Sequence, residues 1–297
     1  MKTNKTAAFT LVELMIVLAL IAIITGLATN EAWRWRGARL GETSLKNLAE
    51  IKEAVVGEAG YLDDLGRLPN HPRDLSQLWT PPDSETEFYA VRPATFANLS
   101  PPASPLDADE AISIPCGWRG PYLRLPLGKE KKLLDAWGNA METPDDAGYT
   151  ARLIRTPDGS VIGVKHLGAD GAPDDVLTPQ EEQDKDAKLL FYPPHLPPAS
   201  LTNSTLTVTV NAYDPDGNPA PPAALQITAR VYAPDGGKIA VSKATAPLLN
   251  NTLTLEIPTL TPGTRTLRIE YGTNKTPPRQ ILIRPGANAV TERILSF

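Results

Sequence analysis

The chain has 297 residues, of which 41% are hydrophobic and 21% are charged, as is usual for a globular protein, and the length suits two domains better than one. The formal net charge of −5 argues against nucleic acid as a partner. The single cysteine, Cys116, excludes an internal disulfide and a multi-cysteine metal site, and we expect it to be buried.

A basic leader followed by an apolar stretch opens the chain. The leader, MKTNKTAA at 1–8, carries Lys2 and Lys5, and the stretch 9–30 contains one charge, Glu13. About 20 apolar residues cross a bilayer, so 9–29 is long enough to be a transmembrane helix. Because the lysines precede it, the N-terminus is expected in the cytoplasm and the rest outside. A carboxylate inside such a segment is costly, which predicts a specific task for Glu13.

The order of these features resembles the N-terminal signature of type IV prepilins and pseudopilins: a basic leader, a small residue, Phe, and an apolar helix with Glu at its fifth position. The resemblance implies that a prepilin peptidase cleaves between Ala8 and Phe9 and that Phe9 is then N-methylated. The family usually has Gly where Ala8 stands. It also implies that Glu13 pairs with the N-terminal amine of a neighbouring subunit, since buried opposite charges cost less together than alone.

Two other interpretations of this N-terminus stay open. A secretory signal peptide would be cut after the small residues Gly26-Leu27-Ala28, so that the mature chain begins at Thr29. A plain uncleaved membrane anchor would keep the leader. Neither interpretation gives Glu13 a task, whereas the prepilin interpretation uses Ala8, Phe9 and Glu13 together.

The apolar pattern continues beyond the membrane segment. Apolar residues recur three or four positions apart at Leu45, Leu48, Ile51, Val55, Ala59 and Leu62. This spacing predicts one helix over 9–62 whose outer half packs on a globular head. Gly57 and Gly60 weaken the end of that helix.

The head is expected at 63–190. Residues 61–80, and the segments GPYL at 120–123 and DAWGN at 135–139, resemble major pseudopilins of type II secretion. The proline-rich stretch 81–115 predicts a long surface loop. Alternating patterns predict two short strands, at 149–154 and 160–166, around a turn at 157–159. The acidic pair Asp63-Asp64 is interpreted as solvated surface.

The loop HLGADGAPDDVL at 166–177 is a candidate calcium site. Three carboxylates in one glycine-containing loop repel each other unless a cation joins them, and calcium prefers six to eight oxygen ligands. The spacing is not that of an EF-hand, but the loop resembles the calcium loop of major pseudopilins. That resemblance implies side-chain oxygens from Asp170, Asp174 and Asp175 and carbonyl oxygens from Leu167 and Ala172. A solvated acidic turn is the alternative.

After a proline-rich linker at 191–200 the composition changes. Residues 201–297 are rich in Thr, Val, Leu and Ile, with turn signals at 214–217 and 234–237. Strand-like alternation occurs in six segments: 206–213, 225–233, 238–244, 252–258, 264–271 and 279–285. These features predict an all-β, immunoglobulin-like sandwich. The expected class is therefore α+β: a long pilin helix, a small head with an antiparallel sheet, and this C-terminal sandwich.

Enzymatic motifs are absent from the sequence, which has no HExxH pair, GxSxG elbow, P-loop or GxGxxG after a strand. We therefore do not expect an enzyme. The resemblance implies a structural subunit of a type II secretion pseudopilus or a related type IV pilus-like filament. Such a subunit is a single-pass protein of the bacterial inner membrane with its head in the periplasm, and it can end in an extracellular filament.

The partners implied are the prepilin peptidase, copies of the chain and other pseudopilins, the inner-membrane assembly platform and the lipid bilayer. Two alternatives stay open: a type IV pilin-like adhesin whose C-terminal sandwich binds a surface or ligand, and a secreted β-sandwich binding protein with only an export signal. The mature N-terminus separates the last of these from the other two.

Overall fold

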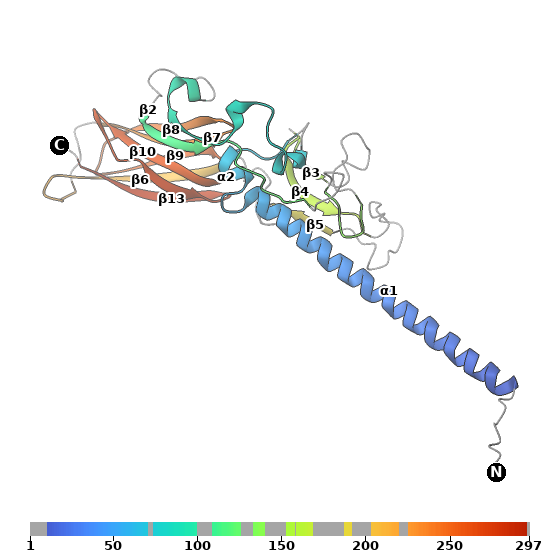
Figure 1. Cartoon of the computed structure of the whole chain (residues 1–297). Helices are drawn as coiled ribbons and strands as arrows, with labels where there is room; N and C mark the ends of the chain where they lie inside the picture. Colours follow the sequence, from blue (N-terminus) through green and yellow to red (C-terminus); the bar gives the residue numbers. More distant parts are fainter. Residues whose placement is uncertain are drawn as a thin grey trace, which may run out of the picture.

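The computed structural model describes residues 11–70, 74–99, 109–125, 133–139, 153–157, 159–168, 187–191, 203–219 and 225–295. One long helix leads away from a region of several β-sheets, so that the start of α1 lies far from the C-terminal strands (Figure 1). The fold is α+β, as the sequence predicts.

The long helix α1 spans Leu11–Val56. Its first half is exposed, and 11–29 belongs to a span that is long and apolar enough to cross a membrane. In its second half the predicted apolar stripe is confirmed at four positions and wrong at two. Leu48, Ile51, Val55 and Leu62 are buried, whereas Leu45 and Ala59 are exposed.

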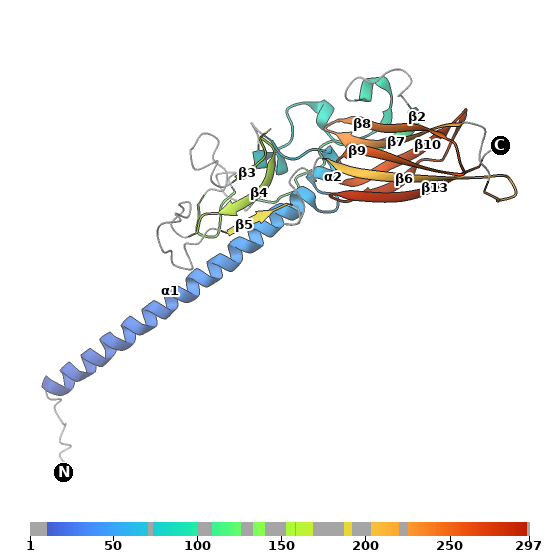
Figure 2. The same ribbon diagram turned by 180° about the vertical axis from the view of Figure 1, so that it is seen from behind.

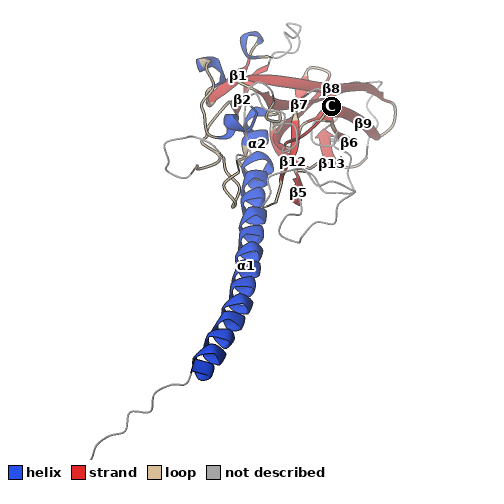
Figure 3. Ribbon diagram, turned by 90° about the vertical axis from the view of Figure 1, so that its right-hand side faces the viewer, coloured by secondary structure: helices blue, strands red, loops and turns tan. Residues whose placement is uncertain are grey.

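The predicted helix over 9–62 is interrupted near its end. After α1 the chain turns through Gly57–Gly60, where Ala59 has a φ of 61°, and then forms the short helix α2 (Tyr61–Leu65). Glycine favours such an interruption because it loses more backbone entropy in a helix than other residues do. The break brings α2 beside the β-sheets (Figure 3).

The head contains a three-stranded antiparallel sheet in the order β3 (Leu153–Arg155), β4 (Val161–His166) and β5 (Ala187–Leu190). Strand β4 confirms the strand predicted at 160–166, and β3 overlaps the one predicted at 149–154, of which 151–152 and earlier residues lie outside the described ranges. The sheet, α1, α2 and the 3-10 helix η1 (Asp74–Leu78) share one apolar cluster, which includes Leu48, Ile51, Leu65, Leu78, Val161 and Val164.

The prediction of a surface loop at 81–115 is wrong for the parts of this segment that the structure describes, 81–99 and 109–115. This segment contains the short 3-10 helices η2 (Glu85–Glu87) and η3 (Phe96–Asn98) and an antiparallel hairpin of β1 (Ala90–Ala94) and β2 (Asp109–Cys116). Pro93 and Pro115 lie within these strands, which is tolerated in a two-stranded sheet because its edges need no further partner. The proline content of this segment therefore led to the wrong prediction of a loop. Cys116 is buried and free, as expected.

Two further sheets form the C-terminal region (Figure 2). All six strand segments predicted there are found as strands. One sheet has the order β8-β7-β10, with β11 and β12 both paired to β10, and the other has the order β9-β6-β13. Their bounds are β6 (Ser204–Tyr213), β7 (Leu225–Asp235), β8 (Lys238–Leu248), β9 (Thr252–Leu260), β10 (Gly263–Tyr271), β11 (Asn274–Lys275), β12 (Arg279–Ile283) and β13 (Ala287–Leu295).

The two C-terminal sheets share one apolar cluster. Alternate residues of β6 point into it, and they meet inward-facing residues of β7, β9 and β10 such as Ile227, Ile257 and Ile269. Strand β13 runs parallel to β6, a pairing that the sequence pattern did not indicate. The hairpin β1–β2 forms a separate cluster with Tyr232 and Ile239 of the sheet β8-β7-β10, so it joins the predicted head to the C-terminal region.

Candidate assembly helix and interdomain junction

Helix α1 carries Glu13, the residue predicted to act in assembly. Ala8 and Phe9 lie outside the described residues, so the structure does not test the cleavage or methylation site. Glu13 lies in the first turn of α1, where a carboxylate interacts favourably with the helix dipole. The side chains around it are apolar and exposed: Leu11 by 75% and Met15 by 62%. So much exposed apolar surface requires lipid or other protein chains to cover it.

The predicted calcium ligands fall mostly outside the described residues. Asp170, Ala172, Asp174 and Asp175 are among those outside, and Leu167 is buried just after β4. No group of three or more His, Cys, Asp or Glu side chains that could hold a metal occurs in the described parts of the chain. The calcium site therefore stays a prediction.

The turn at 135–139 lies at the base of that loop. The buried Asp135 accepts hydrogen bonds from the backbone N–H groups of Trp137 and Asn139, at 3.0 and 2.8 Å. Asn139 Nδ2 donates to the carbonyl of Gly168 at 3.3 Å, and the Trp137 ring lies 5.1 Å from that of His166. Two segments singled out in the sequence thus contact each other.

This turn is also fastened to the helix. The backbone N–H of Ala136 donates to Ser44 Oγ at 3.1 Å, and Ser44 is fully buried. A buried hydroxyl needs such a partner, because an unpaired polar group away from water is costly. The contact fixes the position of the head along α1.

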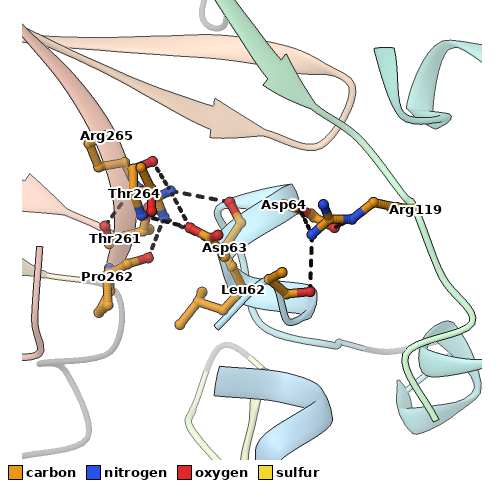
Figure 4. A network of polar contacts seen from close by, with 9 residues as sticks. Leu62, Asp63, Asp64, Arg119, Thr261, Pro262, Thr264 and Arg265 are labelled. Carbon is orange, nitrogen blue, oxygen red and sulfur yellow. Dashed lines mark hydrogen bonds and ion pairs between the residues drawn. The ribbon is translucent and has the colours of Figure 1, made fainter. Parts of the chain in front are cut away.

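Asp63 and Asp64 on α2 form a polar junction between the head and the C-terminal region, so the interpretation of this pair as solvated surface is wrong (Figure 4). The Asp64 carboxylate is buried and is held by Arg119, with Nη2 and Nε each 3.0 Å from one of its oxygens. Tyr122 donates to the same carboxylate at 2.9 Å. These contacts of Asp64 anchor helix α2 to the head.

Asp63 points the opposite way, toward β10. Its carboxylate accepts the backbone N–H of Thr264 at 2.6 Å and lies 3.4 Å from Nη1 of Arg265. The Arg265 side chain is buried, with 1% of the residue exposed, and its burial lowers its pKa to about 10. It also donates to backbone carbonyls, which belong to Leu62, Asp63, Thr261, Pro262 and Thr264. One guanidinium therefore bridges α2 and the C-terminal sheet.

Two glycines allow the backbones to approach closely at the same junction. The turn between β7 and β8 lies against the end of α2, where the Gly236 N–H donates to the carbonyl of Leu65 at 2.7 Å. A Cβ added to Gly66, whose φ is +67°, would lie 1.7 Å from the carbonyl oxygen of Pro234. A Cβ on Gly237 would lie 1.6 Å from that of Thr86. The sequence predicted the turn at 234–237 but gave no sign of what it contacts.

A third ionic contact joins the β1–β2 hairpin to the C-terminal sheet. The buried Asp109, at the start of β2, lies 2.6 Å from Nη1 of Arg268 on β10. Charge-assisted hydrogen bonds of this length are the stronger ones in proteins. Together with the apolar cluster under the hairpin, this ion pair holds the C-terminal sheets against the head.

The contribution of Asp64 to the stability of the fold should depend on pH. Burial raises its pKa above the ordinary 3.8, and the Tyr122 hydrogen bond and Arg119 charge offset only part of that effect. Because the pKa is higher in the folded state, the stabilisation from this group is complete below 3.8 and is lost as the pH rises through the folded-state pKa. Asp64→Asn should therefore cost more stability at about pH 3.5 than at pH 7. Urea unfolding at both values measures this, and a larger cost at pH 7 would contradict it.

Comparison with known protein families gives a match at the N-terminal segment. Residues 3–29 match the model of the prokaryotic N-terminal methylation motif. The chain therefore carries a type IV prepilin-like N-terminal methylation motif, followed by an apolar helix that is a candidate membrane anchor. No curated protein matches the chain.

Proposed function

We propose that the chain is a structural subunit of a type II secretion pseudopilus or a related type IV pilus-like filament. The observation that carries the proposal is the exposed apolar half of α1 with Glu13 in its first turn, within a methylation motif. Cleavage before Phe9 would create an α-amino group, which is cationic unless its pKa is shifted. Glu13 of an adjacent subunit would pair with that amine as subunits leave the bilayer and stack.

The junction at α2 supports a structural role for the chain. The buried Arg265, the Asp64–Arg119 pair and the close approach at Gly66 join the C-terminal sheets to the end of the helix. A large C-terminal region held in this way would keep one orientation on every subunit of a filament. No catalysis is needed for this role.

Expression together with a prepilin peptidase and an assembly platform tests the proposal. Cells should release sheared filaments that sediment at high speed and contain the chain, whereas cells without the peptidase should retain the chain in the inner membrane. Release of the chain as a soluble monomer would instead support a secreted binding protein and contradict the proposal.

A calcium site in the loop 166–177 belongs to this proposal. Binding to the folded state alone stabilises a protein by about 2.7 kcal/mol at a concentration 100 times the Kd. We expect calcium to raise the melting temperature of the full chain in detergent, and Asp174→Ala to remove most of that rise. Asp216→Ala, which removes an exposed carboxylate from another turn, is the matched control. A melting temperature indifferent to calcium would contradict the site.

The adhesin alternative has one observation in its favour. The C-terminal sheets lie at the end of the molecule opposite the membrane helix, where a partner outside the cell would meet them (Figure 1). Deletion of 201–297 separates the two functions: an adhesin would lose surface binding and keep its filaments. Loss of secretion with intact binding would favour the pseudopilus.

A further inference from the structure

Two tryptophans and three arginines follow the apolar run of α1 within seven positions: Trp33, Arg34, Trp35, Arg36 and Arg39, in the segment 33–39. Trp33 and Trp35 are 60% and 68% exposed. Large aromatic side chains are seldom left in water to this extent without a partner. Neither the methylation motif at 3–29 nor the contact at Ser44 involves this segment.

The two tryptophans lie on different sides of the helix. Residues two positions apart on an α-helix are rotated by about 200°, so Trp33 and Trp35 point in nearly opposite directions. A single neighbouring protein would cover one side of α1 and leave the other exposed. A medium that surrounds the helix, such as the interface of a bilayer, accommodates both.

The distance of this segment from the start of α1 matches the thickness of the hydrocarbon core of a bilayer. Helix α1 is continuous from Leu11, and Trp33 is 22 positions further along it, which corresponds to about 33 Å at 1.5 Å per residue. The hydrocarbon core of a bilayer is about 30 Å thick. If the apolar run fills this core, Trp33 and Trp35 reach its boundary, where tryptophan is enriched in membrane proteins.

The arginines add positive charge at the same level. Arg34 lies 3.9 Å from Glu31, but within the described residues Arg36 and Arg39 pair with no carboxylate. The Arg36 guanidinium lies over the Trp33 ring, 5.6 Å from its centroid. Trp35, Arg36 and Arg39 border an open hollow of about 570 Å³, which Ala32 and Leu40 complete. Guanidinium groups bind phosphate oxygens in bidentate geometry.

We propose that the segment 33–39 binds the headgroup of an anionic phospholipid. Arg36 and Arg39 hold the phosphate, while Trp33 and Trp35 lie at the boundary between headgroups and acyl chains. The segment thereby sets the depth of α1 in the bilayer and the height of the head, which is hydrogen-bonded to the helix at Ser44. This inference rests on the membrane anchorage in the proposed function and adds a lipid partner to it.

Quenching of tryptophan fluorescence by brominated lipids tests the proposal. The full chain is reconstituted into vesicles of phosphatidylcholine and phosphatidylglycerol, with one lipid brominated at a time. We expect quenching to report a preference for phosphatidylglycerol of about fivefold for each engaged arginine. Trp33→Phe combined with Trp35→Phe should remove the quenched fraction, because the other tryptophans, Trp79, Trp118 and Trp137, belong to the head.

Charge variants separate lipid selectivity from simple insertion. Arg36→Gln combined with Arg39→Gln should bring the preference close to one while the protein still floats with the vesicles. Lys46→Gln removes an exposed positive charge seven positions beyond Arg39 and should leave the preference unchanged.

Each contrary outcome has its own meaning. If the chain does not float with vesicles, the membrane anchorage in the proposed function fails as well. If it floats but shows no quenching that depends on Trp33 and Trp35, or quenches equally with both lipids, only the lipid site is overturned. Quenching that disappears as the protein-to-lipid ratio rises would show that a second copy of the chain covers the segment, which also overturns the lipid site.

Discussion

We expect the Glu13→Ala variant to insert into the membrane and lose its leader normally, yet to be absent from filaments. Insertion depends on the apolar run, which the substitution makes more apolar. Assembly depends on the pairing of Glu13 with the amine of the next subunit. Removing one partner of a buried ion pair costs about 3–5 kcal/mol, because the other charge is left uncompensated. That penalty corresponds to at least about a hundredfold loss of incorporation.

The measurement is the fraction of the chain in sheared filaments, compared with the fraction that has lost its leader. Glu42→Ala is a suitable control, since Glu42 is an exposed carboxylate on the same helix beyond the apolar run. It should assemble as well as the unaltered chain. Normal filament yield from Glu13→Ala would contradict the role assigned to Glu13.

The second large effect is expected at the junction. Arg265→Ala should lower the free energy of unfolding by about 3–5 kcal/mol, because it leaves the Asp63 carboxylate without its cationic partner and the carbonyls of Leu62 and Asp63 without the guanidinium donor. The truncation also creates a cavity between α2 and β10, and surrounding side chains fill such cavities only in part. Urea unfolding of the full chain in detergent measures the change.

Arg279→Ala is the matched control for this experiment. Arg279 also pairs with a carboxylate, Glu292 at 2.6 Å, but 57% of its side chain is exposed. Surface ion pairs contribute at most about 1 kcal/mol, so this variant should remain close to the unaltered chain. Equal effects of Arg265→Ala and Arg279→Ala would show that the buried guanidinium does not hold the two regions together.

Local patterns predicted much of the fold. Apolar residues spaced three or four positions apart identified most of the packed face of α1, and alternating patterns located the six predicted C-terminal strands. Each pattern reports which side of an element is buried. The interruption near Gly57 was also foreseen as a weak point. The predicted burial of Leu45 and Ala59 was wrong, because apolar spacing alone does not show where the head begins or where the helix ends.

Long-range contacts could not be predicted in this way. The hairpin β1–β2 was hidden by prolines, which usually mark loops but are tolerated in a strand with a free edge. Asp63 and Asp64 look like a solvated pair because their partners, Arg265 and Arg119, are distant in sequence. The parallel pairing of β13 with β6 depends on the order of strands in space, which alternation does not encode.

The candidate site was predictable only near the N-terminus. There the signature is contiguous, so Ala8, Phe9 and Glu13 could be singled out directly, and the methylation motif matches the same segment. The sequence did not predict a lipid site at 33–39. That inference requires knowing that Trp33 and Trp35 are exposed on two sides of one continuous helix, which only the structure shows.

The mature N-terminus tests the central claim most directly. The chain should be purified from membranes of cells that express a prepilin peptidase and be analysed by intact-mass spectrometry and N-terminal sequencing. We predict a chain that begins at Phe9 and is one methyl group heavier than its sequence. A chain that begins at Thr29, or one that still carries residues 1–8, would contradict the filament-subunit account.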